Sequence, residues 1–259
     1  MTSETDKTQV KQTIGILIPF CSRKQNWKTI YDIDFFKNFL PFFYSSISNK
    51  YNYRFYLGID DNDKFLMSFR EDIEKCLNVD DKIIIVNKKY NGNPYGIWNL
   101  LLENAKDECN YFYQCGSDIA HLTKDWDKYF INILKKNNNI GITGGVDKQF
   151  WLERIIRNQN GILENIFFHK THYNIFKRFI NPKFHTWFGD DYMSQLYRYS
   201  NSTFICSNHL YINCNRVGGH QPDKNRYEPT IEMQNKWLHI AKEDSKLITE
   251  FLNKSNVEK

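Results

Sequence analysis

Short apolar runs that alternate with longer amphipathic stretches are the feature that most constrains how this chain can fold. The apolar runs lie at residues 13–20, 53–59, 82–86, 111–115 and 140–144. The stretches with helical spacing lie at about residues 27–48, 65–76, 95–106 and 125–136. Such short runs are typical of strands buried on both faces of a parallel sheet, and the segments between them supply the covering helices. The pattern predicts an α/β fold with a mostly parallel central sheet and flanking helices.

The second half of the chain follows a weaker pattern. Helices are predicted at residues 171–179, 192–199 and 230–253, and short strands at 202–206 and 209–214. No internal repeat or linker separates the halves, and a length of 259 residues suits one large α/β domain. We therefore expect a single domain, which divides into a polar tail at 1–12, a first half at 13–145 and a second half at 146–259.

The charge and cysteine content exclude several classes of protein. The net charge of +5 is spread along the chain without a Lys/Arg block, so we expect no nucleic-acid partner. The six cysteines form no CxxC pair, which argues against a structural zinc site and for reduced thiols. The N-terminal residues are polar, and no apolar run reaches the length of a membrane span. We therefore expect a cytoplasmic protein without a signal peptide or membrane span.

Polar side chains follow the first four predicted strands at the points where they end. In strand order they are Ser22 and Arg23, Asp60 and Asp61, Asn93, and Ser117 and Asp118. Ligands of open parallel sheets bind beyond the carboxyl ends of the strands, so we expect these side chains to line a binding site. Simpler interpretations exist for some of them. Asp60 and Asp61 also suit a turn, and Arg23 also suits a solvated surface.

Asp118 is the most informative of these residues. It follows a strand with three aromatic side chains and comes two positions after Gly116. A carboxylate in this position is a natural ligand for Mg²⁺ or Mn²⁺, which prefer oxygen donors. The alternative is a turn or helix N-cap residue. The sequence therefore indicates a candidate site for a divalent cation at Asp118.

Five short motifs occur in a fixed order along the chain. They are Pro19-Phe20, Asp60-Asp61, Trp98-Asn99, Gly116-Ser117-Asp118 and Gly189-Asp190-Asp191. In this order they resemble glycosyltransferases of the GT-A fold, family-two-like members among them. The segment 113–119, together with 189–191 and the following Leu196-Tyr197, is also similar to glycosyltransferases of large DNA viruses. The resemblance covers about residues 13–220.

This resemblance implies a Rossmann-like GT-A domain. Its nucleotide-sugar-binding half would be residues 13–145, and its acceptor-binding and catalytic half would be residues 146–259 with the C-terminal helix. The cofactor would be Mn²⁺ or Mg²⁺. A viral origin would place the protein in the host cytoplasm or in the virion.

The resemblance also implies a set of residues that bind the nucleotide-sugar donor. By position they are Phe20, Ser22, Arg23, Asp60, Asp61, Asn93, Trp98, Asn99, Ser117 and Asp118. Ser117 and Asp118 occupy the place of the family's DxD motif, whose carboxylates hold the metal and the ribose. Gly116 stands where the first carboxylate is expected. In such folds a histidine after the acceptor helix often adds a second metal ligand, and His209 is preferred here to His220.

Asp190 and Asp191 resemble the acidic pair of inverting GT-A enzymes. There, a carboxylate takes the proton of the acceptor hydroxyl as it attacks the anomeric carbon. By the resemblance, Asp191 is the base, and Asp190 orients it or binds the acceptor sugar. The pair also suits the start of the predicted helix 192–199, because acidic residues complement the helix dipole. Trp187 is expected to stack on an acceptor sugar, with core packing as the alternative.

The function predicted from these residues is metal-dependent glycosyl transfer with inversion. The donor would be a UDP- or GDP-sugar, and the acceptor would be a hydroxyl of a glycan or glycoprotein. A non-catalytic protein that binds nucleotide-sugars or glycans is one alternative, since a DxD carboxylate is missing. A nucleotidyltransferase is another, because it would share the nucleotide-binding half. The acidic pair at 190–191 favours glycosyl transfer, and no oligomeric state is predicted.

Overall fold

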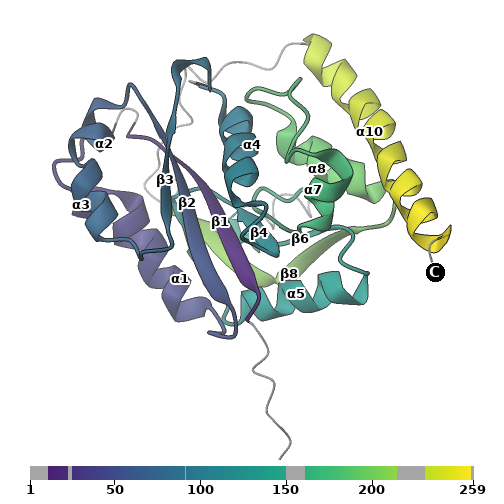
Figure 1. Cartoon of the computed structure of the whole chain (residues 1–259), viewed down its shortest axis with the longest axis horizontal. Coiled ribbons are helices and arrows are strands. Elements are labelled where there is room, and N and C mark those ends of the chain that lie inside the picture. The colour runs from purple at the N-terminus through teal and green to yellow at the C-terminus, as the bar shows by residue number, and fades with distance from the viewer. Residues whose placement is uncertain (1–10, 23–24, 91, 150–160, 215–230, 258–259) are drawn as a thin grey trace, which may run out of the picture.

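Eight strands form one mixed sheet within the residues that the structure describes, which are 11–22, 25–90, 92–149, 161–214 and 231–257 (Figure 1). The structure is a computed structural model. The strands are β1 (Thr13–Phe20), β2 (Asn52–Asp60), β3 (Lys82–Val86), β4 (Tyr111–Gln114), β5 (Ile119–His121), β6 (Ile142–Asp147), β7 (Ile166–His169) and β8 (Thr203–Asn213). Their order across the sheet is β3-β2-β1-β4-β7-β6-β8-β5. Because this one sheet joins both halves of the chain, they form a single α/β domain.

The five strands predicted for the first half are confirmed: four of them form a parallel block, and the fifth, predicted at 140–144, is β6, which pairs with β7 and β8. β1 pairs in parallel with β2 and with β4, and β2 pairs in parallel with β3. Residues 14–18 and 55–60 are buried throughout. Both faces of these strands are covered, so both need apolar side chains, and the strands therefore appear in the sequence as continuous apolar runs.

The second half departs from the predicted pattern. β7 lies antiparallel between β4 and β6, β8 runs parallel to β6, and β5 pairs antiparallel with β8 at the edge of the sheet. The two short strands predicted at 202–206 and 209–214 are one strand, β8. The sequence predicts neither β5 nor β7, because three and four residues are too few to show a period. Pairing with their neighbours defines them instead.

Helices cover both faces of the sheet. They are α1 (Leu40–Ser46), α2 (Lys64–Ser68), α3 (Arg70–Lys75), α4 (Pro94–Ala105), α5 (Trp126–Lys136), α7 (Thr171–Phe176), α8 (Gly189–Arg198) and α10 (Ile231–Val257), with the helical turns η1 (Ile30–Asp32), η2 (Phe35–Phe39) and η3 (Lys88–Tyr90). Residues of η2, α1 and α5 pack in one core, and those of α4, α7, α8 and α10 pack in the other. Figure 1 shows α1, α2 and α3 at one side of the molecule and α10 beside α8 at the opposite side.

Two predicted helices are interrupted. The helix predicted at 27–48 forms η1, η2 and α1, and the one predicted at 65–76 forms α2 and α3. Phe69 separates α2 from α3, because its backbone leaves the helical region with φ −104° and ψ 10°. The spacing of the apolar residues predicts the buried face of each segment, but it does not predict where the helix is interrupted.

The Asp244 carboxylate of the C-terminal helix α10 makes several polar contacts with the second half. Asp244 accepts hydrogen bonds from the Tyr192 hydroxyl at 2.6 Å and from the Asn181 amide at 2.8 Å, and it pairs with Arg178 at 3.1 Å. These contacts hold α8 in place from the side opposite the sheet. Among the helices in the described part of the chain, none combines the length and apolar character needed to cross a bilayer.

Candidate functional site

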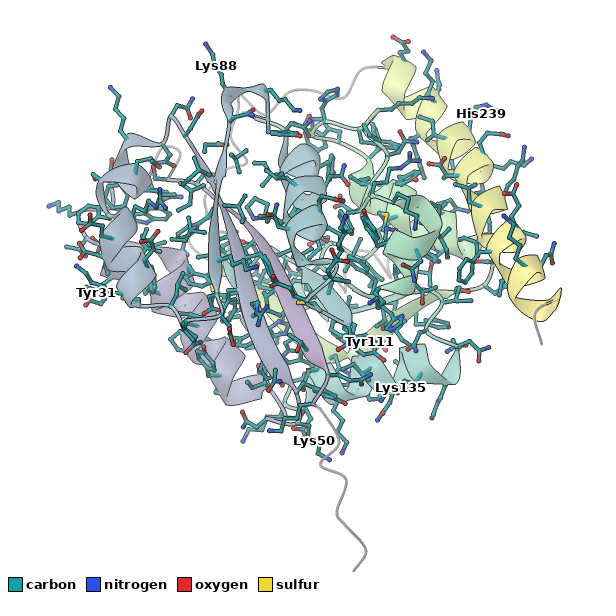
Figure 2. The ribbon with its side chains drawn as sticks, viewed as in Figure 1. Tyr31, Lys50, Lys88, Tyr111, Lys135 and His239 are labelled. Atoms are coloured by element: carbon teal, nitrogen blue, oxygen red, sulfur yellow. The ribbon has the colours of Figure 1, made fainter. Side chains whose placement is uncertain are left out.

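The carboxyl ends of β1 to β4 lie at one edge of the sheet, because these strands are parallel. Figure 2 shows this edge where Lys88 projects outward after β3, opposite the end that carries Lys50 before β2. Phe20 belongs to the core, since it is buried and its ring meets Phe35 edge-to-face at 5.5 Å. Arg23 lies outside the described residues.

One carboxylate ties together the loops after β1 and β2. Asp63 accepts hydrogen bonds from the Ser22 backbone N–H and the Ser22 hydroxyl, both at 2.6 Å. It also accepts from the Leu66 N–H at 3.1 Å and so caps α2. Asp60 is buried at the end of β2, whereas Asp61 is exposed. Of the two predicted donor-binding carboxylates, Asp61 is therefore the more accessible to a ligand.

Trp98 and Asn99 use their polar groups to hold α4 in the fold. The Trp98 indole N–H donates to the Leu17 carbonyl oxygen at 3.1 Å. The Asn99 side-chain oxygen accepts from the N–H groups of Phe179 and Ile180, at 2.7 and 2.9 Å. The Asn99 amide donates to the Ile180 carbonyl oxygen at 3.0 Å. The structure thus gives both predicted donor-binding residues a structural role between β1 and the loop before α8.

In the segment after β4, Gly116 stands in place of the first DxD carboxylate and leaves room for the Asp118 side chain. A Cβ atom on Gly116 would lie 2.4 Å from Asp118 Oδ1, so a side chain there would displace the Asp118 carboxylate. The Asp118 backbone carbonyl accepts from the Cys214 N–H at 2.7 Å, which joins this segment to the end of β8. The Gly116 N–H meets the Asn165 side-chain oxygen at 3.4 Å. Ser117 and Asp118 are both half-buried at this edge.

The strand register separates the two residues predicted to bind one metal ion. Cys214 lies opposite Asp118, and His209 lies five residues earlier, which is about 16 Å away at the usual rise of a strand. The His209 ring stacks on Tyr129 at 4.1 Å, and burial lowers the pKa of this histidine. His220 lies outside the described residues. Across the described ranges, no three His, Cys, Asp or Glu side chains gather as a metal site would require.

The N-terminus of α8 is held by the first turn of α4. The Tyr95 hydroxyl donates to Asp190 Oδ1 and accepts from the Gly189 N–H, both at 3.0 Å. A Cβ atom on Gly189 would lie 2.2 Å from the Tyr95 ring, so this approach requires glycine. Phe188 turns the chain into the helix with a left-handed φ of 63°. The helix starts three residues before its predicted start, so Asp190 and Asp191 lie in its first turn.

Interacting carboxylates distinguish this helix start from an ordinary cap. Burial, followed by the charges of Asp191 and Glu164, raises the pKa of Asp190 to about 6. The Tyr95 hydroxyl opposes this rise, because its hydrogen bond favours the ionised carboxylate. Burial and the charge of Asp190 raise the pKa of Tyr95 far above its usual value, so Tyr95 stays a hydrogen-bond donor. A carboxyl group that titrates near pH 6 is suited to proton transfer under physiological conditions.

A small cavity connects the end of β4 with the start of α8. Its lining includes Gln114 from β4, Tyr95 from α4, and Gly189 and Asp190 from α8. Gln114 lies directly before the segment that carries Asp118. The cavity therefore joins Asp190 to the end of β4, the strand that precedes the segment with Asp118, although Gln114 and Asp190 are about seventy-five residues apart in sequence.

The loop before α8 lies beside the start of α4. Asn93 caps α4, and its side-chain amide lies 3.2 Å from His185 Nδ1. Trp187 is half-buried in this loop, and Phe188 stacks on Trp237 of α10 with the ring planes 6° apart. The predicted donor residue Asn93 and the predicted acceptor residue Trp187 thus belong to one loop cluster.

Sequence reasoning missed three residues of this region: Tyr95, Glu164 and Asn165. Tyr95 follows Pro94, a position that the sequence marks only as the start of a helix. Glu164 and Asn165 precede the unpredicted strand β7, in a stretch without a clear period. A sequence pattern cannot find these residues, because tertiary contacts alone bring them to the acidic pair.

No family model matches this sequence, and no curated protein matches it. Solved structures do match in fold. TarS of S. aureus is 11% identical with a TM-score of 0.51, and the alignment covers 77% of this chain and 36% of TarS. The catalytic domain of Drosophila β1,4-galactosyltransferase 7, in complex with xylobiose, is 11% identical with a TM-score of 0.50, covering 87% of this chain and 80% of that one. GalNAc-T7 with UDP, GalNAc and Mn²⁺ is 9% identical with a TM-score of 0.55, covering 79% and 44%.

The chain has a GT-A fold. The predicted fold class is therefore confirmed: a single α/β domain with a mixed, mostly parallel sheet and flanking helices. The chain spans 36% of the TarS chain and 44% of the GalNAc-T7 chain, so it corresponds to a part of those two proteins. The similarity to viral enzymes stays a prediction.

Proposed function

We propose that this chain is an inverting glycosyltransferase that uses a UDP- or GDP-sugar and a divalent cation. The observation that carries the proposal is the acidic pair at the start of α8, of which Asp190 lines a cavity together with Gln114 at the carboxyl end of β4 in a GT-A fold. Two structures of similar fold support it through the ligands that they contain. GalNAc-T7 contains UDP, GalNAc and Mn²⁺, and galactosyltransferase 7 contains the disaccharide xylobiose.

The donor site in this proposal lies in the first half, residues 13–145. Ser22, Asp61, Asn93 and Ser117 follow the strands that end at this edge and would contact the nucleotide-sugar. Asp118 would hold the cation, since a half-buried carboxylate is a suitable hard ligand. Mg²⁺ is often bound by one or two carboxylates together with substrate phosphates, so a single protein carboxylate fits a cation that arrives with the donor. When bound, the cation would neutralise charge on the departing diphosphate.

Asp191 acts as the general base in this proposal. Its carboxylate takes the proton from the acceptor hydroxyl while that oxygen forms a bond to the anomeric carbon. The bond from the anomeric carbon to the diphosphate oxygen breaks on the opposite face, and the nucleoside diphosphate leaves with the bonding electrons. Asp190, fixed by Tyr95, orients the base or accepts a hydrogen bond from the acceptor sugar. Trp187 would contact the acceptor from the second half, residues 146–259.

Metal-dependent donor binding is the first test. Thermal unfolding of the wild-type protein is followed with a panel of UDP- and GDP-sugars, with and without Mn²⁺. We expect one donor to raise the Tm only when Mn²⁺ is present, and Asp118→Ala to lose that increase. Glu250→Ala, which alters an exposed carboxylate on α10, is the matched control and should keep it. Equal stabilisation of wild type and Asp118→Ala without metal would contradict the role of Asp118.

A further inference from the structure

The Tyr95 hydroxyl occupies a bridging position between two elements of the candidate site. It belongs to the first turn of α4, while both of its hydrogen-bond partners belong to the first turn of α8. It accepts from the Gly189 N–H and donates to Asp190 Oδ1, each at 3.0 Å. The hydroxyl therefore satisfies a backbone donor of the helix start and restrains the adjacent carboxylate at the same time.

The Tyr95 ring cannot easily leave this position. It is 7% exposed and tilts against Trp98, with ring centroids 5.9 Å apart. Gly189 approaches it so closely that an added Cβ atom would lie 2.2 Å from Cζ and 2.6 Å from the hydroxyl oxygen. Close packing on both sides fixes the direction of the hydroxyl, and this direction sets the position of the Asp190 carboxylate.

Negative charge faces Asp190 from two elements. Asp191 lies beside it on α8, and Glu164 acts on it from the segment before β7. Gln114 from β4 lines the same cavity but is uncharged. The Tyr95 hydroxyl is a polar donor that contacts the carboxylate directly, so it opposes the repulsion of the other two acids.

We propose that Tyr95 is a positioning residue for glycosyl transfer, which fixes the Asp190 carboxylate beside Asp191 through its hydroxyl. The inference rests on the proposed function. An ionised Asp190 can accept a hydrogen bond from the acceptor and so hold the acceptor hydroxyl beside Asp191, the proposed base. Loss of the hydroxyl leaves Asp190 facing two acids without its donor, and Asp190 then takes up a proton at higher pH.

The test replaces Tyr95 with phenylalanine, which keeps the ring and removes the hydroxyl. In Tyr95→Phe, we expect the acidic limb of the kcat/KM profile to move up by roughly one pH unit, because one hydrogen bond to a charged group has that effect. The loss of activity should therefore be about fivefold near pH 6, should approach about tenfold at lower pH, and should shrink toward pH 8.5. An equal loss at every pH would overturn the inference, since a merely structural role predicts that result.

Tyr173→Phe is the matched control. The Tyr173 hydroxyl also donates to a carboxylate, that of Glu103, at 2.8 Å, but this pair lies at the surface between α7 and α4. Removal of this hydroxyl should leave the pH profile unchanged. A shift of the same size in Tyr173→Phe would show that the profile does not report on Asp190.

Two further measurements keep the inference separate from the proposed function. The Asp190 carboxyl is titrated by NMR in wild type and in Tyr95→Phe, with Asp190→Asn for assignment. We expect the Asp190 midpoint to be higher in Tyr95→Phe, whether or not a transfer assay succeeds. Equal midpoints would overturn the inference, while absence of transfer in wild type would overturn only the function. If Tyr95→Phe does not fold, the Tyr95 Cζ resonance in labelled wild type must follow the Asp190 titration, and a resonance that does not would overturn the inference.

Discussion

Two acidic segments of this molecule have similar sequences and opposite environments. The first, residues 60–63 at the end of β2, contains Asp63, which accepts three hydrogen bonds from Ser22 and Leu66. The second, at the start of α8, contains Asp190, which accepts one from Tyr95 and faces two other acids. The carboxylate of Asp63 is thus surrounded by donors, and that of Asp190 by negative charge.

The difference between these surroundings indicates which carboxylate can change its protonation state. Three hydrogen bonds hold the Asp63 side chain in one position, where it joins two loops. Burial and like charges raise the pKa of Asp190 to about 6, so this group can change its protonation state near neutral pH. Asp63 should therefore matter for stability, and the pair Asp190 and Asp191 for turnover.

Asp191→Asn should give the largest effect. The amide cannot take a proton, so we expect transfer to fall by about 10²–10⁴-fold. The Tm increase produced by the donor nucleotide-sugar should remain, because Asp191 is not part of the donor site. The measurements are the rate of nucleoside diphosphate release and the thermal shift of the same protein. Retention of full activity would remove the base assignment and break the contrast between the two acidic segments.

Asp63→Ala should affect stability rather than the chemical step. Loss of three hydrogen bonds, one of which is the α2 cap, is expected to lower the free energy of unfolding by about 2–3 kcal/mol. Denaturant unfolding measures this change, with Asp61→Ala as the control. Asp61 is exposed, so its replacement should cost less than about 0.5 kcal/mol. Equal stability of Asp63→Ala and wild type would contradict the structural role.

Gly189→Ala should be intermediate. The added Cβ atom would overlap the Tyr95 ring, which is buried and cannot yield, so we expect a loss of about 1–3 kcal/mol in unfolding free energy. Gly116→Ala is the contrasting variant, because its Cβ atom meets only the movable end of the Asp118 side chain. It should cost clearly less stability. Equal costs would show that the Tyr95 contact is not rigid.

Asp190→Asn should have the smallest effect on the unfolding free energy, and it should raise this energy where the preceding substitutions lower it. The pKa of Asp190 is raised in the folded state, so wild type loses stability as the pH rises from about 4 through 6. The asparagine variant lacks this loss. Relative to wild type, its unfolding free energy should therefore increase by about 1–2 kcal/mol between pH 4 and pH 8, after allowance for partial solvent screening. Parallel pH-stability curves would contradict the raised pKa.

The fold was largely accessible from the sequence, because strands buried on both faces must be apolar throughout. The block β1 to β4 follows directly from this requirement. β7 could not be found in the same way, since its four residues are defined by pairing with β4 and β6. The order of strands in the second half is likewise a property of tertiary contacts.

The candidate site was accessible only in part. Asp118, Asp190 and Asp191 were predicted because they stand at strand or helix ends in motifs with a known resemblance, and their roles stay predictions. Tyr95 was not found, since its partner Asp190 lies 95 positions away in sequence. Asn99 shows the opposite case, because a polar residue in a motif bonds to the backbone of the protein itself. Local sequence patterns identify polar groups that could bind a ligand or react. They do not show which of these groups already make hydrogen bonds within the folded protein.

The most direct test of glycosyl transfer at this site is the identity of the product released from the donor. Purified protein is incubated with Mn²⁺, a stabilising nucleotide-sugar and a glycan acceptor, and the products are separated by mass. The proposed function predicts free nucleoside diphosphate and an acceptor heavier by one sugar, both greatly reduced in Asp191→Asn. Release of pyrophosphate would show nucleotidyl transfer instead. A donor that binds the protein fully but stays intact would show a non-catalytic binding protein. Either result would contradict the proposed glycosyl transfer.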